Sequence, residues 1–177
     1  MPTIAILTLC TSIVTAQNGT VIAFHGRNDM VRVSRDGGYT WEMERSIGRQ
    51  ASGGNALVDE TNGDILFVNP QRGGSGMLWR SSDHGETWHS GQITVLPDGF
   101  ALLPSSVGSM QAGITLLHGE HKGRLLMPAR IMGPEGSNQV PWRAYHYSTA
   151  IFSDDQGKTW QTSKPFPVLG TGEGALA

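Results

Sequence analysis

The sequence contains one cysteine, Cys10, in 177 residues. A single cysteine excludes an internal disulfide framework and a cysteine-based metal site, so cysteine content leaves the cellular compartment open. Charged residues are also few, at 16%, and the 13 basic and 15 acidic side chains give a formal net charge of −2. Neither a run of basic residues nor a stretch of 18 apolar residues occurs. We therefore expect no nucleic-acid partner and no membrane-spanning helix.

The residues that are abundant indicate a turn-rich globular protein. The chain has 24 glycines and 9 prolines, and 38% of its residues are hydrophobic. This balance differs from that of disordered segments and coiled coils. The length is sufficient for one domain with a hydrophobic core but short for two. We expect a single all-β architecture over residues 1–177.

The first 16 residues, "MPTIAILTLCTSIVTA", allow two interpretations. Their apolar run ends on small residues at the positions that a signal peptidase reads, which is typical of a secretory signal. The first basic residue, however, is Arg27, so the basic segment that opens such signals is absent. The alternative is that residues 3–9 form the first buried strand. On these residues a cytoplasmic or lysosomal location is slightly favoured over a secreted or periplasmic one.

One eight-residue motif occurs three times, as "SRDGGYTW" at 34–41, "SSDHGETW" at 81–88 and "SDDQGKTW" at 153–160. Its Ser and Asp side chains can hydrogen-bond nearby backbone N–H groups, and its Gly can adopt a conformation closed to other residues. We expect a tight turn whose Trp packs between structural units. Because Asp36, Asp83 and Asp155 are equivalent, we interpret them as structural and not catalytic.

The motif closes a larger repeat. Each repeat opens at a glycine turn, at Gly19, Gly63 and Gly123, so successive turns are 44 and 60 residues apart. Apolar runs at 4–9, 56–58 and 114–117 precede these turns, and a further strand is expected to begin at the Trp of each motif. Each repeat thus predicts four antiparallel strands. Four-stranded units of this length are typical of β-propeller blades.

The eight-residue motif is the Asp box, and with its spacing the chain resembles the sialidases (neuraminidases). The stretches "GTVIAFHGR", "KGRLLMPAR" and "TGEGALA" resemble segments that flank sialidase active sites. The resemblance implies a six-bladed β-propeller, of which this chain supplies about three blades, and an exo-α-sialidase that releases terminal sialic acid from sialylated glycans. Asp boxes also occur in sortilin-like receptors. The alternative is therefore a non-catalytic propeller that binds glycan or protein ligands.

The loops that join the second and third strands lie on the propeller face opposite the Asp boxes, because neighbouring strands are antiparallel. We call this face the arginine rim, since these loops carry Arg27, Arg72, Arg130 and Arg143. Guanidinium groups bind carboxylates in bidentate geometry and stay charged, which predicts a local anion pocket. The alternative for each arginine is that it caps a loop or lies in solvent.

The resemblance also implies roles for single residues. Arg27 resembles an arginine that holds the sugar, with Arg130 and then Arg72 as further substrate contacts. Glu173 resembles the glutamate that deprotonates a tyrosine nucleophile. Asp29 matches either the acid/base aspartate or a second, non-catalytic aspartate. Asn55 and Gln111 are candidates for contacts with substrate hydroxyl or acetamido groups, although both residue types are common in turns.

Several expected features are absent. The chain begins Met1-Pro2 without the Arg-Ile-Pro-like motif of sialidases, and the tyrosine nucleophile and two clamp arginines would follow Ala177. We therefore expect an incomplete active site, with exposed strand edges and apolar faces unless further sequence or association completes the propeller. His118 and His121 lack a third ligand, so we expect no metal and no cofactor.

Overall fold

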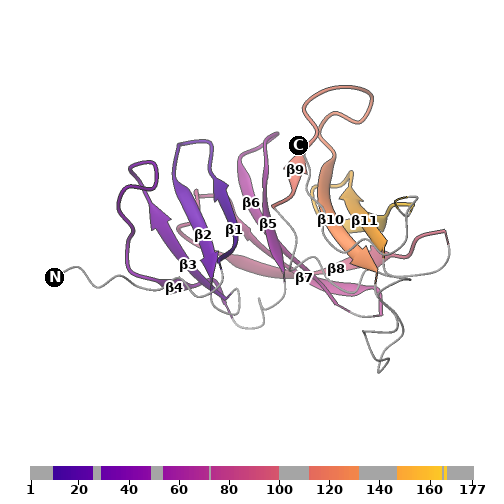
Figure 1. The fold of residues 1–177 in the computed structure, drawn as a ribbon, viewed down its shortest axis with the longest axis horizontal. Helices are drawn as coiled ribbons and strands as arrows, with labels where there is room; N and C mark the ends of the chain where they lie inside the picture. The colour runs from indigo at the N-terminus through magenta and orange to yellow at the C-terminus, as the bar shows by residue number, and fades with distance from the viewer. Residues whose placement is uncertain are drawn as a thin grey trace.

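A computed structural model describes residues 10–25, 29–48, 54–71, 73–99, 112–131, 147–164 and 166. These residues form twelve β-strands and no helix. The described part of the chain therefore has no helix that could cross a membrane. Figure 1 shows the strands grouped into three successive blades. Blade one contains β1 (Cys10–Thr15), β2 (Val21–His25), β3 (Met30–Ser34) and β4 (Arg45–Ser46). Blade two contains β5 (Asn55–Asp59), β6 (Asp64–Pro70), β7 (Ser75–Ser81) and β8 (His89–Leu96), and blade three contains β9 (Ile114–Thr115), β10 (Leu125–Ile131), β11 (Tyr147–Ser153) and β12 (Thr159–Thr162).

The three blades form two hydrogen-bonded sheets. Blade one is a four-stranded antiparallel sheet, whereas blades two and three share an eight-stranded sheet in the order β5-β6-β7-β8-β12-β11-β10-β9. The junction is a parallel pairing in which Thr94 and Leu96 of β8 lie opposite Thr159 and Gln161 of β12. The sequence predicts separate blades. The structure differs because β8 pairs with β7 only as far as Thr94, and its last residues then reach the outer edge of blade three.

The first strands of the blades lie next to one another, with β1 in contact with β5 and β5 in contact with β9. Two hydrogen bonds join the latter pair: the N–H of Gly113 donates to the Ala56 carbonyl at 2.9 Å, and the Thr115 hydroxyl donates to the Val58 carbonyl at 2.7 Å. Inner strands that follow one another in this way are the arrangement of a β-propeller around its axis. The all-β prediction and the partial propeller are confirmed.

Two hydrophobic cores lie between the blades, because side chains of a strand alternate between its faces. On β6, Ile65 and Phe67 join the core shared with blade one, and Leu66 and Val68 join the core shared with blade three. The rings of Phe67 and Phe24 stack across the first core with centroids 4.9 Å apart. Blade two is therefore buried on both faces, which explains the continuous apolar run of β6.

The strand boundaries differ from the prediction in blade one. The sequence predicts a first strand at residues 4–9, but β1 is Cys10–Thr15, and residues 1–9 lie outside the described residues. The reason is a tight turn in which the Ala16 N–H donates to the Thr20 carbonyl at 2.8 Å, so the strand that directly precedes this turn pairs with β2. The segment with two interpretations, 1–16, thus includes β1. The fourth strand begins at Arg45 and not at Trp41.

Candidate functional site

The antiparallel blades have two rims with different contents. One rim carries the turns between the first and second strands and the Asp boxes between the third and fourth. The other is the arginine rim, where the second strands end, the third strands begin, and the chain passes from blade to blade. Among the described residues, those predicted to be catalytic or to bind substrate lie on the second rim.

Each Asp box is a hydrogen-bonded turn built from its own side chains. In blade two the Ser81 hydroxyl donates to Asp83 Oδ1 at 2.7 Å and accepts the Gly85 N–H at 2.8 Å. The Thr87 N–H donates to Asp83 Oδ1 at 2.9 Å. Gly85 has a φ of 91°, in the left-handed region. The other two boxes repeat this pattern with Ser34, Asp36, Gly38 and Thr40, and with Ser153, Asp155, Gly157 and Thr159.

These hydrogen bonds lower the pKa of the three carboxyl groups. For Asp36, the hydroxyl and N–H of Thr40 and the hydroxyl of Ser34 lower the pKa to about 2. At Asp83, burial acts in the opposite direction, but the hydrogen bonds from Thr87 and Ser81 outweigh it and lower the pKa to about 2. Asp155 also has a lowered pKa despite its burial. Each carboxylate accepts its hydrogen bonds from residues of its own turn, which supports a structural role.

Acid should therefore weaken the fold through these turns. A carboxyl whose folded pKa is depressed stabilises the fold above its unfolded pKa, and that contribution is lost as pH falls through the folded value. For Asp36 and Asp83 the window runs from 3.8 down to about 2. We expect the thermal midpoint measured by circular dichroism to fall steeply between pH 4 and 2, and less steeply in Asp83→Asn. An unchanged slope in that variant would contradict the assignment.

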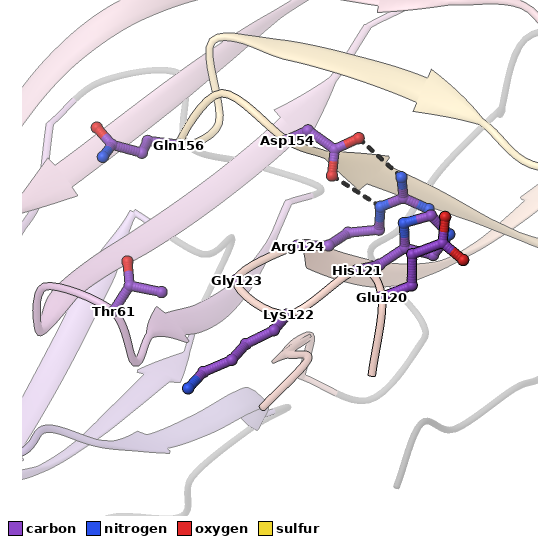
Figure 2. A pocket seen from close by; sticks show the side chains of 8 residues that line it. All are labelled: Thr61, Glu120, His121, Lys122, Gly123, Arg124, Asp154 and Gln156. Atoms are coloured by element: carbon purple, nitrogen blue, oxygen red, sulfur yellow. Dashed lines mark hydrogen bonds and ion pairs between the residues drawn. The ribbon is translucent and has the colours of Figure 1, made fainter. Parts of the chain in front are cut away.

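A pocket of about 430 Å³ opens on the Asp-box rim between blades two and three (Figure 2). Arg124 points to Asp154, and its Nε and Nη2 each donate to a carboxylate oxygen at 2.8 Å. The guanidinium also lies 4.2 Å from the centroid of the Phe152 ring. The lining residues are Thr61, Glu120, His121, Lys122, Gly123, Arg124, Asp154 and Gln156. None of them is a predicted catalytic or substrate-binding residue.

The pocket does not offer a metal centre. Within the ranges given above, no group of three or more His, Cys, Asp or Glu side chains could hold a metal ion. His121 lines the pocket, and the pKa of Asp154 is lowered mainly by the hydrogen bond from Arg124. The ion pair between Arg124 and Asp154 joins two turns of blade three, so we assign it a structural role.

The structure places three of the predicted site residues on the arginine rim, each in a different blade. Asp29 directly precedes β3, and its carbonyl accepts the Ile47 N–H at 2.9 Å. Arg130 is the penultimate residue of β10 and is half-buried. The other predicted residues, Arg27, Arg72, Gln111, Arg143 and Glu173, lie outside the described residues. Their roles stay predictions.

Asn55 is the third predicted site residue on the arginine rim. It is the first residue of β5 and is fully buried. Its Oδ1 accepts the N–H of Ala56 at 2.9 Å, so part of its hydrogen-bonding capacity serves the start of the strand. The assignment of Asn55 to a substrate contact is not tested by this geometry. That contact also stays a prediction.

One buried polar pair on the arginine rim has no counterpart among the sequence motifs. The Tyr147 hydroxyl donates to Asp98 Oδ2 at 2.9 Å, and both residues are 6% exposed. The pKa of Tyr147 is raised mainly by burial and further by the hydrogen bond to Asp98. The pair joins the chain leaving β8 to the start of β11. It could not be recognised in the sequence because "PDG" at 97–99 is an ordinary turn sequence.

Comparisons with known proteins agree with this architecture. The BNR/Asp-box repeat family matches residues 32–43 and 151–162. A sialidase of Micromonospora viridifaciens is 28% identical over 166 residues, and the match covers 77% of this chain and 24% of the sialidase. The chain thus spans about a quarter of the length of this curated relative.

One solved structure shows the same fold at low identity, and a second has a weaker likeness. A protein of unknown function from Dyadobacter fermentans aligns with a TM-score of 0.55 and 18% identity, over 90% of this chain and 55% of that protein. A Trypanosoma rangeli sialidase in complex with 2,3-difluorosialic acid aligns with a TM-score of 0.49 and 18% identity, over 87% of this chain and 30% of the sialidase. The second likeness is too weak to support a function. The chain thus contains BNR/Asp-box repeats in a partial β-propeller, and it is similar to sialidases.

Proposed function

We propose that this chain forms part of an exo-α-sialidase, a retaining glycoside hydrolase that releases terminal sialic acid from glycoconjugates. The observation that carries the proposal is the 28% identity with a sialidase over 166 residues, together with the matched Asp boxes. The chain spans 24% of that relative. The sialidase resemblance implies active-site residues, among them a tyrosine nucleophile, that this sequence does not contain.

The arginine rim supplies the chemistry for holding the substrate. Sialic acid carries a carboxylate on its anomeric carbon, and guanidinium groups pair with carboxylates in bidentate geometry. We assign this contact to Arg27 and Arg130, with Arg72 as a further contact. Asn55 and Gln111 are assigned to the hydroxyl or acetamido groups of the sugar. The positions of Asn55 and Arg130 on one rim support the assignment.

The catalytic step is assigned to Glu173 and Asp29. The substrate carboxylate would repel an anionic nucleophile, so a tyrosine that Glu173 deprotonates is the suitable nucleophile. That tyrosine lies outside this sequence. Asp29 would give a proton to the leaving oxygen and later activate water. Its place directly before β3, on the arginine rim, is compatible with this role.

The test is the release of fluorophore from a 4-methylumbelliferyl sialoside at mildly acidic pH. In a protein that contains this chain together with the segment carrying the tyrosine nucleophile, we expect Glu173→Gln to lower kcat by at least about a hundredfold, because general acid–base groups contribute about 10²–10⁴-fold. Glu120→Gln, on the opposite rim, is the matched control and should leave kcat unchanged.

The alternative function makes a different prediction in the same samples. A folded chain without turnover contradicts catalysis by this chain alone. If that sample binds sialyllactose in calorimetry, the non-catalytic glycan-binding propeller explains the result. If Glu173→Gln and Glu120→Gln have equal turnover, the assignment of Glu173 is wrong.

A further inference from the structure

The hydrogen bond between Tyr147 and Asp98 joins two blades at the arginine rim. Tyr147 is the first residue of β11 in blade three, and Asp98 lies two residues after the end of β8 in blade two. The bond is 2.9 Å long, and both residues are 6% exposed. Removing one partner of a buried hydrogen bond leaves the other unsatisfied, which is costly. The pair therefore fixes the start of β11 against the chain that leaves blade two.

Asp98 belongs to a segment that is itself held in place. The Gln161 side-chain amide donates to the Pro97 carbonyl at 2.7 Å, and the Thr162 hydroxyl donates to the Leu96 carbonyl at 2.7 Å. Both donors belong to β12, the last strand of blade three. The two residues before Asp98 are thus anchored, so its carboxylate offers the phenol a fixed acceptor.

The pair lies beside a predicted substrate contact. In the pairing of β10 with β11, Tyr147 lies opposite Ile131 and Ser148 lies opposite Arg130. Among the described residues, these two pairs are the part of the ladder nearest the arginine rim. The ends of strands open more easily than their middles. The bond to Asp98 therefore holds the end of the ladder that carries Arg130.

A phenol beside a carboxylate also has the residue types of a tyrosine nucleophile and its base. A nucleophile, however, needs an activated hydroxyl that can reach the substrate. Tyr147 is 6% exposed, and its hydroxyl is occupied as the donor to Asp98. Burial and this bond also raise its pKa, which opposes activation. The geometry therefore favours a positioning role over a nucleophilic one.

We propose that Asp98 and Tyr147 are positioning residues that hold Arg130 in the geometry needed to bind the substrate carboxylate. The proposal rests on the proposed function, which assigns that contact to Arg130. Bidentate pairing of a guanidinium with a carboxylate depends on orientation, so a shift of the strand end weakens substrate binding. Both residues are buried and act through β10, so the effect falls on KM and not on kcat.

Steady-state kinetics with a 4-methylumbelliferyl sialoside test this role, in a protein that contains this chain together with the segment carrying the tyrosine nucleophile. Tyr147→Phe removes the hydroxyl and should raise KM at least about fivefold, the equivalent of one lost hydrogen bond, with kcat within about twofold. Asp98→Ala should have the same effect. Asp98→Asn keeps an acceptor for the hydroxyl and should keep KM within about twofold of the wild type.

Thr115→Val is the matched control, because it removes another buried hydrogen bond between the same two blades. The Thr115 hydroxyl donates to the Val58 carbonyl at 2.7 Å. Thr115 lies opposite Leu125, the first residue of β10, and so near the Asp-box rim. Its replacement should lower the thermal midpoint but leave KM unchanged. In Arg130→Ala, which has no guanidinium to position, adding Tyr147→Phe should not raise KM further.

Hydrogen exchange measured by mass spectrometry on the same protein needs no turnover. We expect peptides from β10 and β11 to exchange faster in Tyr147→Phe than in the wild type or in Asp98→Asn. Unchanged exchange, or a KM in Tyr147→Phe equal to that of the wild type, would overturn the positioning role. An equal rise of KM in Tyr147→Phe and Thr115→Val would overturn it too, because a general loss of stability would then explain both.

Failure of the proposed function gives a different result. A protein that neither hydrolyses the sialoside nor binds sialyllactose contradicts the proposed function, and with it the role of the pair toward substrate, whatever the exchange pattern. Normal turnover with an unchanged KM in Tyr147→Phe contradicts the positioning role only.

Discussion

Replacing Trp160 by alanine should lower the free energy of unfolding by about 3–5 kcal/mol, the cost of removing a large aromatic from a packed core. The side chain is fully buried in the core between blades two and three, in the same cluster as Leu66 and Leu78. Its indole N–H donates to the Gly157 carbonyl at 3.0 Å, so the substitution also removes a bond that closes the Asp box. The expected loss is a large part of the stability of a domain of this size.

Trp41 provides the matched control, because it occupies the same position of the motif. It is half-buried, and an added Cβ on the glycine of its Asp box would meet no residue of another described blade. Trp41→Ala should cost about 1.5 kcal/mol or less. Equilibrium unfolding in guanidinium chloride measures both variants. Equal losses would contradict the packing of Asp boxes against preceding blades.

Gly85→Ala should destabilise the fold by about 2–5 kcal/mol, for two separable reasons. A left-handed backbone costs a residue with a Cβ about 1–2 kcal/mol, and Gly85 has a φ of 91°. The added Cβ would also lie 2.8 Å from Ile22 Cδ1 in the core between blades one and two. Overpacking of this kind costs about 1–3 kcal/mol.

Gly38→Ala separates the two causes. Gly38 has a φ of 94° but its added Cβ would meet only Trp41, at 3.9 Å. We expect this variant to lose only the conformational part, about 1–2 kcal/mol. The difference between the two variants in urea unfolding then measures the contact with Ile22. A Gly38→Ala variant as unstable as Gly85→Ala would show that backbone strain alone explains both.

The blades could be predicted from the sequence because their signals are short-range. Ser81, Asp83, Gly85 and Thr87 form their hydrogen bonds within one eight-residue motif, so the residue types specify the turn directly. The neighbouring apolar residues Leu66 and Phe67 point to opposite faces of β6, so the sequence likewise indicates that both faces are buried. Blade boundaries were less predictable: the apolar run at 4–9 has the composition of a strand, but the turn after Ala16 selects Cys10–Thr15.

The candidate site was predictable only as a set of residue types on one rim. Strand order places Asp29, Asn55 and Arg130 there, and no local pattern reports the distances between them. Asn55 illustrates the limit, since its burial and its bond to Ala56 depend on the start of β5. Asp98 and Tyr147 are 49 residues apart in sequence, and no motif joins them.

By itself, the sequence determined the all-β class, the three Asp-box turns and the four-stranded repeat, because hydrogen bonds and strand alternation act over a few residues. Only the tertiary structure decided which repeats bury their faces. The three Trp residues of the motif differ in burial: Trp41 contacts no other described blade and is half-buried, Trp88 meets Phe24 of blade one and is half-buried, and Trp160 is fully buried in the core shared with blade two. The parallel junction of β8 with β12 and the bond from Tyr147 to Asp98 were likewise decided by contacts between distant segments, which form when the blades pack face to face.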